Sequence, residues 1–299
     1  MLRHGLGARG YKIRVFDQFR GPMVALLRHP FLATSSSRLL LKVARRGKKV
    51  MRRVERALIG AGIVRPGLDN IFDLRSHLVD RFRGSDVVIH LAGLPHEHVK
   101  GAMAADFHRI NYEGSINVFE AAREAGIPQF IFASSAQVYK INKPVRLDQF
   151  PILESNHCPT LEEGQSLYGW LKFQFEQYLA QACRDGRAQS IALRLEMPGM
   201  RSHSCENFYI STSIENLVSG VSSALASELD SGFEAFNLAD AVVDEQVVNI
   251  QRFILEKWPH VKNRTVGNQC LLSIEKARKL LNYKPRPGGR YRDFSVVWD

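Results

Sequence analysis

Short apolar runs that alternate with longer amphipathic stretches constrain this chain more than any other feature. The apolar runs lie at 87–91, 130–133 and 191–195, and apolar residues at helical spacing fill 104–125 and 167–183 between them. Two parallel strands need a crossover connection, and that connection is usually a helix. The pattern therefore predicts an α/β fold with a doubly wound parallel sheet.

The pattern changes after residue 195. A loop rich in Ser, His and Asn covers 201–212. Beyond it, the pattern of apolar residues predicts a short strand at 235–238 and three helices at 214–225, 245–258 and 274–281. We interpret 196–299 as mainly a small substrate-binding lobe, laid on a larger domain that comprises 1–195.

Positive charge is concentrated at the N-terminal end. The formal net charge is +11, and residues 1–56 carry 15 Lys/Arg against only Asp17 and Glu55. The densest part, 38–56, predicts a basic helix within an insertion at about 19–60. Such a helix can bind anionic lipid or nucleic-acid phosphates. A solvated helix that packs its apolar side on the body is the favoured interpretation, because charge runs are usually solvated.

The cysteines give no sign of a metal site or a disulfide framework. The four are scattered, none forms a Cys-x-x-Cys pair, and no His cluster accompanies them. Reduced thiols of this kind are typical of a reducing compartment. We expect a cytoplasmic protein without a membrane span. An organelle matrix is the alternative, because the Arg-rich, acid-poor start resembles a transit peptide.

Four blocks of sequence carry a specific resemblance. Residues 86–93 are DVVIHLAG, 111–118 are NYEGSINV, 132–139 are FASSAQVY and 168–172 are YGWLK. In this order and spacing they resemble the extended short-chain dehydrogenase/reductases of the NAD-dependent epimerase/dehydratase family. The resemblance implies a Rossmann-like fold. It also implies an epimerase, dehydratase or oxidoreductase that uses NAD on a nucleotide sugar or similar hydroxyl compound.

Tyr168 and Lys172 are the centre of the expected catalytic site. Residues four apart on a helix share a face, so both side chains can enter one cleft. An ammonium group near a phenol favours the phenolate and lowers its pKa, which allows proton exchange with a substrate hydroxyl. By resemblance, Ser135 holds the reacting oxygen, Lys172 also holds the nicotinamide ribose, and Asn111 completes the set.

The expected cofactor contacts come from strand ends and from the resemblance. Asp17 closes a predicted strand, where an acid accepts hydrogen bonds from the adenosine ribose and favours NAD over NADP. A residue that merely closes the strand is the alternative. Asn70 and Ile71 resemble an adenine-contacting motif, with Asn70 in place of its first acid. The full set of expected contacts is Asp17, Asn70, Ile71, Leu91, Ala92, Gly93, Lys172 and Pro198.

The glycine-rich loop of the family does not match. In the family, G-x-x-G-x-x-G follows the first strand and lets the backbone approach the pyrophosphate. Gly5, Gly7 and Gly10 have similar spacing, but no strand precedes them, and 12–16 is predicted as the second strand. We therefore expect the first strand and the loop to be missing, as in a shortened reading frame. Unpaired strand neighbours then predict poor stability or pairing, for example as a homodimer.

Two functions stay open from the sequence. One is the NAD-dependent enzyme described above. The other is a cofactor-deficient, non-enzymatic scaffold or binding protein on the same fold, which would use the basic insertion. On the substrate side, 196–200 is EMPGM where the family has N-V-Y-G-P, so nucleotide-sugar recognition rests on the resemblance alone.

Overall fold

The computed structural model describes the larger part of the chain. Its described residues are 74–94, 103–141, 147–186, 188–196, 198, 210–229, 232–245, 248–287 and 289, with the backbones of two strands at 12–16 and 24–28. The expected contacts Asp17, Asn70 and Ile71 lie outside the described residues. So do the glycines at 5, 7 and 10 and the basic segment 38–56.

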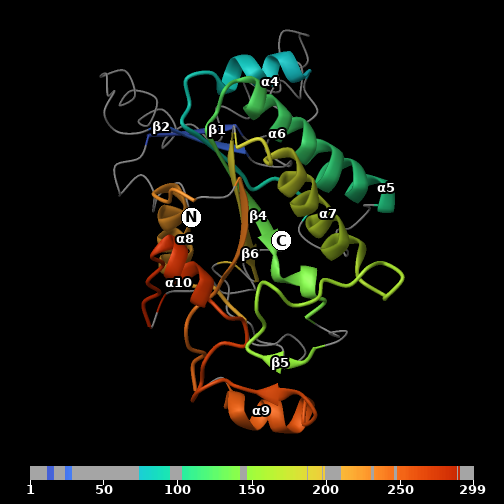
Figure 1. Ribbon diagram of the computed structural model, residues 1–299, viewed down its shortest axis with the longest axis vertical. Helices are drawn as coiled ribbons and strands as arrows, with labels where there is room; N and C mark the ends of the chain where they lie inside the picture. The colour runs from blue at the N-terminus through green and yellow to red at the C-terminus, as the bar shows by residue number, and fades with distance from the viewer. Residues whose placement is uncertain are drawn as a thin grey trace, which may run out of the picture.

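A six-stranded sheet forms the centre of the molecule (Figure 1). Its strands, in spatial order, are β1 (Lys12–Phe16), β2 (Val24–Arg28), β3 (Val87–His90), β4 (Gln129–Ser135), β6 (Gln189–Leu195) and β7 (Phe233–Leu238). The four strands from β3 to β7 pair in parallel. The predicted parallel α/β fold is therefore confirmed.

The two N-terminal strands depart from the expected arrangement. β2 lies within the predicted insertion and pairs antiparallel with β3, and β1 pairs antiparallel with β2. The two reversals give β1 the direction of the parallel strands, two positions from β3, which is the place predicted for a second strand. The expectation that β3 would lack a neighbour on this side was wrong, because β2 satisfies its backbone groups.

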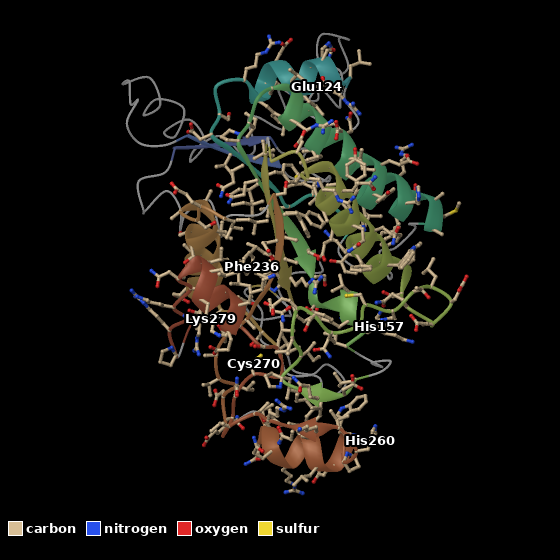
Figure 2. All side chains as sticks on the ribbon, viewed as in Figure 1. Glu124, His157, Phe236, His260, Cys270 and Lys279 are labelled. Atoms are coloured by element: carbon tan, nitrogen blue, oxygen red, sulfur yellow. The ribbon has the colours of Figure 1, made fainter. Side chains whose placement is uncertain are left out.

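Helices cover both faces of the sheet (Figure 1). On one face lie α4 (Arg75–Phe82), α6 (Gly114–Glu124) and α7 (Leu167–Ala182), and on the other lie α8 (Ile214–Leu225) and α10 (Glu275–Leu281). Each face encloses its own apolar core. Phe119, Phe130, Phe132 and Phe175 belong to the first, and Leu193, Val221, Phe236 and Leu238 belong to the second. Side chains fill both layers, with Phe236 close to the middle (Figure 2).

The helix predicted at 104–125 is interrupted. It consists of α5 (Ala104–Phe107), a π-helical turn η2 (His108–Glu113) and α6. Asn111 lies in the wide turn, where the Ser115 hydroxyl donates to its carbonyl oxygen at 2.9 Å. Such turns occur frequently at functional sites, because the extra residue redirects side chains. Apolar spacing alone could not reveal it.

A small lobe lies at one end of the sheet, at the bottom of Figure 1. It contains β5 (Gln149–Phe150), β8 (Lys262–Asn263) and α9 (Ile250–Lys257). α9 is shorter than the predicted 245–258, because Asn249 caps it: its side chain accepts a hydrogen bond from the Arg252 amide at 2.9 Å. β5 reaches the lobe from the N-terminal part of the chain, whereas β7 returns from the C-terminal part to the main sheet.

Two surveys of the described residues bear on function. Among them, no helix has both the length and the apolar character needed to cross a membrane. The same residues contain no group of three His, Cys, Asp or Glu placed to hold a metal ion. Cys158, Cys183 and Cys270 are free thiols.

Replacing Phe175 by Ala should destabilise the fold strongly. Its ring is fully buried between α7 and the sheet, 4.8 Å from the Phe132 ring between centroids. The cavity should lower the free energy of unfolding by about 3–5 kcal/mol in urea titrations. Leu255→Ala is the control, because that side chain is 70% exposed on α9 and its loss should cost less than about 0.5 kcal/mol. Equal effects of the two changes would contradict the described packing of α7.

Candidate active site

The candidate site lies at the carboxyl edge of the parallel strands. Ser135 ends β4 opposite Leu195, the last residue of β6, and His90 ends β3 opposite Phe132. Side chains that follow these strands therefore meet at one edge. In doubly wound sheets this edge is where ligands bind.

The start of α7 brings Tyr168 to this edge. Ser166 caps the helix, with its hydroxyl accepting from the Gly169 amide at 3.0 Å. A Cβ at Gly169 would lie 2.5 Å from the carbonyl oxygen of Gln137, so only glycine allows α7 to approach the end of β4 so closely. In this position a hydrogen bond joins the hydroxyl groups of Tyr168 and Ser135. Two of the predicted catalytic residues are thus brought into contact.

Lys172 lies one turn further along α7 and is buried. Its Nζ donates to the Ala133 carbonyl oxygen at 2.8 Å and lies 4.5 Å from the Phe132 ring centroid. Burial lowers the pKa of Lys172 to about 8, although the charge of Glu176 opposes this. An ammonium group has three donors, and two of them have no hydrogen-bond partner among the described residues. These donors remain for a ligand.

The pKa of Tyr168 is raised, which corrects the sequence-based expectation. Burial is the largest cause, the hydrogen bond with Ser135 opposes it, and the charge of Glu196 adds to it. Lys172 was expected to lower this pKa. Instead its Nζ is directed to Ala133 and lies 5.8 Å from the Tyr168 ring centroid. Tyr168 is therefore a neutral phenol at neutral pH.

Asn111 fixes the segment that follows β3. Its Oδ1 accepts from the Leu94 amide at 2.7 Å, and its Nδ2 donates to the Leu94 carbonyl oxygen at 3.1 Å. A Cβ at Gly93 would lie 3.0 Å from that Oδ1 and 3.6 Å from Nζ of Lys172. The absence of a side chain at Gly93 therefore leaves space beside Lys172. Asn111 thus positions this segment next to Lys172.

The remaining expected cofactor contacts that the structure describes have different settings. Leu91 is half-buried and packs on the core, and Ala92 is buried. Pro198 is exposed beyond the end of β6, where it forms a parallel bridge with Thr212. Of these three, Pro198 is the most exposed, and Leu91 keeps part of its surface exposed. All three nevertheless flank the carboxyl edge of the sheet.

Sequence reasoning missed Glu196, which follows β6 directly. The residue is only 8% exposed, and its Oε1 accepts from Nε2 of Gln137 at 3.3 Å. Burial raises the pKa of Glu196 to about 7, with the Gln137 hydrogen bond opposing. Its charge acts on Tyr168. The departure from the family pattern at 196–200 was the signal that could have drawn attention to it.

His90, the last residue of β3, stabilises the site through a buried hydrogen bond. Its Nε2 lies 2.8 Å from the Ser115 hydroxyl, and that hydroxyl donates to Asn111, so Nε2 carries the hydrogen. Burial, and then the charge of Lys172, lower the pKa of His90 to about 3. The neutral ring ties β3 to the π-helical turn. This contact helps to hold Asn111 in place.

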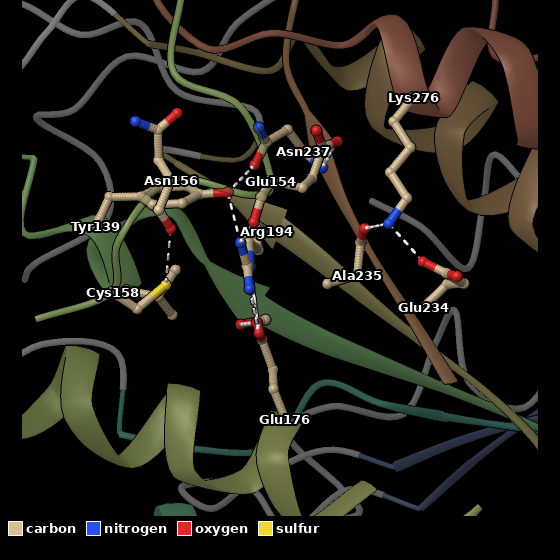
Figure 3. A network of polar contacts seen from close by, with 12 residues as sticks. Tyr139, Glu154, Asn156, Cys158, Glu176, Arg194, Glu234, Ala235, Asn237 and Lys276 are labelled. Carbon is tan, nitrogen blue, oxygen red and sulfur yellow. Dashed lines mark hydrogen bonds and ion pairs between the residues drawn. The ribbon is translucent and has the colours of Figure 1, made fainter. Parts of the chain in front are cut away.

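A buried polar network ties α7 to the sheet (Figure 3). Arg194 on β6 donates to Glu176 on α7 from Nη2 at 2.6 Å and from Nε at 3.1 and 3.2 Å. The Ser134 hydroxyl donates to the same carboxylate. Nη1 of Arg194 also contacts the Tyr139 hydroxyl, which donates to Oδ1 of Asn237 on β7 at 2.8 Å. The network joins one helix to three strands.

Comparison with known proteins identifies the family. Residues 39–228 match the NAD dependent epimerase/dehydratase family. The chain belongs to this family. A stretch of 80 residues is 38% identical to L-arabinose 1-dehydrogenase (NAD(P)(+)) of Haloferax volcanii, covering 26% of this chain and 30% of that protein. Another stretch, of 112 residues, is 33% identical to UDP-glucose 4-epimerase of Erwinia amylovora and covers 37% of this chain and 31% of that enzyme. The chain thus matches less than a third of each of these two family members.

Solved structures support the same fold. A short-chain dehydrogenase/reductase superfamily protein from Agrobacterium tumefaciens with bound NAD has a TM-score of 0.55 and 20% identity over 79% of this chain and 89% of its own. UDP-glucose-4-epimerase from Stenotrophomonas maltophila, with NAD and a formylated UDP-arabinopyranose, has a TM-score of 0.54 and 21% identity. That match covers 73% of this chain and 76% of the epimerase chain. At this identity the likeness shows the fold of the family.

Removing both members of the buried ion pair should cost less than the sum of the two single removals. Glu176→Leu or Arg194→Met alone leaves an uncompensated charge in the core, which should lower the free energy of unfolding by about 3–5 kcal/mol. The double variant should lose markedly less than the sum of the two. Urea denaturation of the four proteins measures this coupling. Simple additivity would show that the pair contributes no direct interaction.

Proposed function

We propose that this chain is an enzyme of its family: an NAD-dependent epimerase, dehydratase or oxidoreductase acting on a nucleotide sugar or similar hydroxyl compound. One observation carries the proposal. The Tyr168 hydroxyl is hydrogen-bonded to that of Ser135, beside the buried ammonium group of Lys172, at the ligand-binding edge of the sheet. Relatives named as UDP-glucose 4-epimerases support the substrate class.

The described residues fit the nicotinamide end of NAD. Lys172 has two donors that the described residues do not use, which suits ribose hydroxyls, and Gly93 leaves space beside it. When bound, the nicotinamide supplies the hydride acceptor or donor. We assign the same end to Pro198, and the adjoining contacts to Leu91 and Ala92. Asp17, Asn70 and Ile71 are our proposed contacts for the adenosine end.

Tyr168 and Ser135 manage the proton. When a substrate oxygen binds between these two hydroxyl groups, it takes the place of their mutual hydrogen bond and forms hydrogen bonds with both. Because burial keeps Tyr168 protonated, it is prepared to donate a proton to a substrate carbonyl oxygen. The reverse direction needs the phenolate, which the raised pKa of Tyr168 disfavours, so donation to a carbonyl oxygen is the direction that this site favours. Asn111 contributes by fixing the Gly93 segment rather than by touching the reacting oxygen.

The rest of the assignment is proposed beside this site. Residues 1–195 form mainly the NAD-binding domain and 196–299 mainly the substrate-binding lobe, with β5 exchanged into the lobe and β7 into the main sheet. A homodimer, and the cytoplasm with an organelle matrix as the alternative, stay proposals that do not depend on the site. A scaffold that uses the basic segment 38–56 on nucleic acid or anionic membrane is the competing function. Its distinguishing property would be binding that falls steeply with salt.

Replacing Tyr168 by Phe should separate binding from chemistry. The variant keeps the ring but loses the proton donor, so turnover should fall about 100-fold or more while the Kd for NAD changes less than about twofold. Calorimetric titration with NAD and a turnover assay measure the two. Tyr178→Phe is the matched control on the same helix, because its hydroxyl donates to Glu120 away from the site. Absence of saturable NAD binding at about 1 mM would favour the scaffold.

Replacing Lys172 by Met should weaken NAD binding directly. The change keeps an unbranched side chain of similar length and removes the ammonium group, which lies over the Phe132 ring and supplies the donors proposed for the ribose. We expect the Kd for NAD to rise about tenfold or more, since hydrogen bonds to charged groups are among the stronger ones. Lys279→Met on the exposed part of α10 should leave the Kd unchanged. An unchanged Kd in the Lys172 variant would place the cofactor elsewhere.

A further inference from the structure

Glu196 is a buried carboxyl group that the proposed proton transfer does not use. It is 8% exposed at the end of β6, and Oε1 accepts the single hydrogen bond from Gln137. Oε2 has no hydrogen-bond partner among the described residues. Within that part of the chain, one oxygen of this carboxyl group is thus available to a ligand.

Glu196 acts on the reacting residues themselves. Its charge contributes to the raised pKa of Tyr168. Its partner Gln137 follows the end of β4, where the Gln137 amide donates to the Ser135 hydroxyl at 3.1 Å. A ligand oxygen held between Tyr168 and Ser135 therefore has Glu196 as a near neighbour. Among the described residues, Gln137 beside the end of β4 contacts this carboxyl group, and Tyr168 on α7 lies within reach of its charge.

Two nearby cations are already committed. Arg194, two residues before Glu196, is bound to Glu176 through Nε and Nη2. Lys172 donates to Ala133, and the proposed function assigns its other donors to the cofactor. Neither cation is free to neutralise a second acid beside Glu196. In a poorly solvated site, two close negative charges repel strongly.

We propose that Glu196 is a specificity-determining residue, which accepts a hydroxyl of a neutral sugar next to the reacting oxygen and rejects sugars with a carboxylate there. The inference rests on the proposed function, because it assumes a sugar at Tyr168 and Ser135. One protein of the same fold, MoeE5, has been solved both with UDP-glucuronic acid and with UDP-glucose. These two ligands differ in the carboxylate that Glu196 would repel, so they form a suitable pair for the test.

The rejection of acidic sugars should depend on pH. Burial raises the pKa of Glu196 to about 7, so the group is mainly protonated below that pH and mainly ionised above it. A uronic acid is ionised throughout this range. Repulsion therefore grows as pH rises through 7. A hydroxyl of a neutral sugar can bond to either form of the carboxyl group.

The test compares two ligands on the NAD-saturated full-length protein. Calorimetry gives the Kd of UDP-glucose and of UDP-glucuronic acid at about pH 6 and about pH 8, for wild type and Glu196→Gln. For wild type we expect the ratio of the two Kd values to favour UDP-glucose and to increase several-fold at the higher pH. In the Gln variant the preference should shrink about tenfold and lose its pH dependence.

Glu120→Gln is the matched control, because Glu120 is also 8% exposed but binds Arg123 and Tyr178 away from the site. Its preference should equal that of wild type. Two results would overturn the role of Glu196 and leave the proposed function standing. One is a wild-type protein that prefers UDP-glucuronic acid, and the other is a Glu196→Gln variant with unchanged selectivity. If the protein binds NAD but neither sugar nucleotide, the inference falls together with the nucleotide-sugar assignment. Failure to bind NAD at all contradicts the proposed function first.

Discussion

The buried contact between Glu176 and Arg194 holds the candidate site together. Glu176 lies one turn beyond Lys172 on α7, and its carboxylate is bound by Arg194 from β6 and by Ser134 from β4. The contact fixes both the rotation and the height of α7 on the sheet. Because Tyr168 is on the same helix, that contact also determines where Tyr168 lies. A carboxylate completely removed from water requires such partners, so the helix has few alternative placements.

The glycine at 169 completes the positioning. The ion pair alone would allow α7 to stand away from the sheet by the width of a side chain. With no Cβ at 169, the backbone closes on Gln137, and the Tyr168 hydroxyl reaches Ser135. The Tyr-Gly pair is thus a packing requirement as well as a motif. Proton chemistry at this edge depends on an approach that any larger residue would prevent.

Local patterns predicted most of the parallel half of the fold and not the N-terminal half. β3, β4, β6 and α7 follow from apolar runs and helical periodicity, which reflect burial at each position. The antiparallel pairing of β2 depends on a long-range contact with β3, which no local pattern encodes. The π-helical turn at Asn111 is invisible for a related reason, because one inserted residue hardly disturbs the apolar spacing around it.

The candidate site divides in the same way. Motifs predicted that Ser135, Tyr168 and Lys172 would meet, and the structure brings them together. Motifs could not predict the electrostatics of these residues. The pKa of Tyr168 depends on desolvation and on the charge of Glu196, and the four-residue spacing between Tyr168 and Lys172 does not determine it. Glu196 was overlooked because it occupies a place where the family pattern gave no expectation for an acid. Burial, which only the fold supplies, turns it into a functional candidate.

The direction of β2 has a consequence for cofactor binding. A parallel strand beside β3 would bring its carboxyl end, and the helix that follows, to the edge where Tyr168 lies. β2 instead begins there, with Val24 opposite His90. The pyrophosphate of a dinucleotide therefore cannot rely on a strand-to-helix turn from this strand. The contacts that we propose at the nicotinamide end, by Lys172 and the Gly93 segment, would then contribute a larger share of the affinity for NAD.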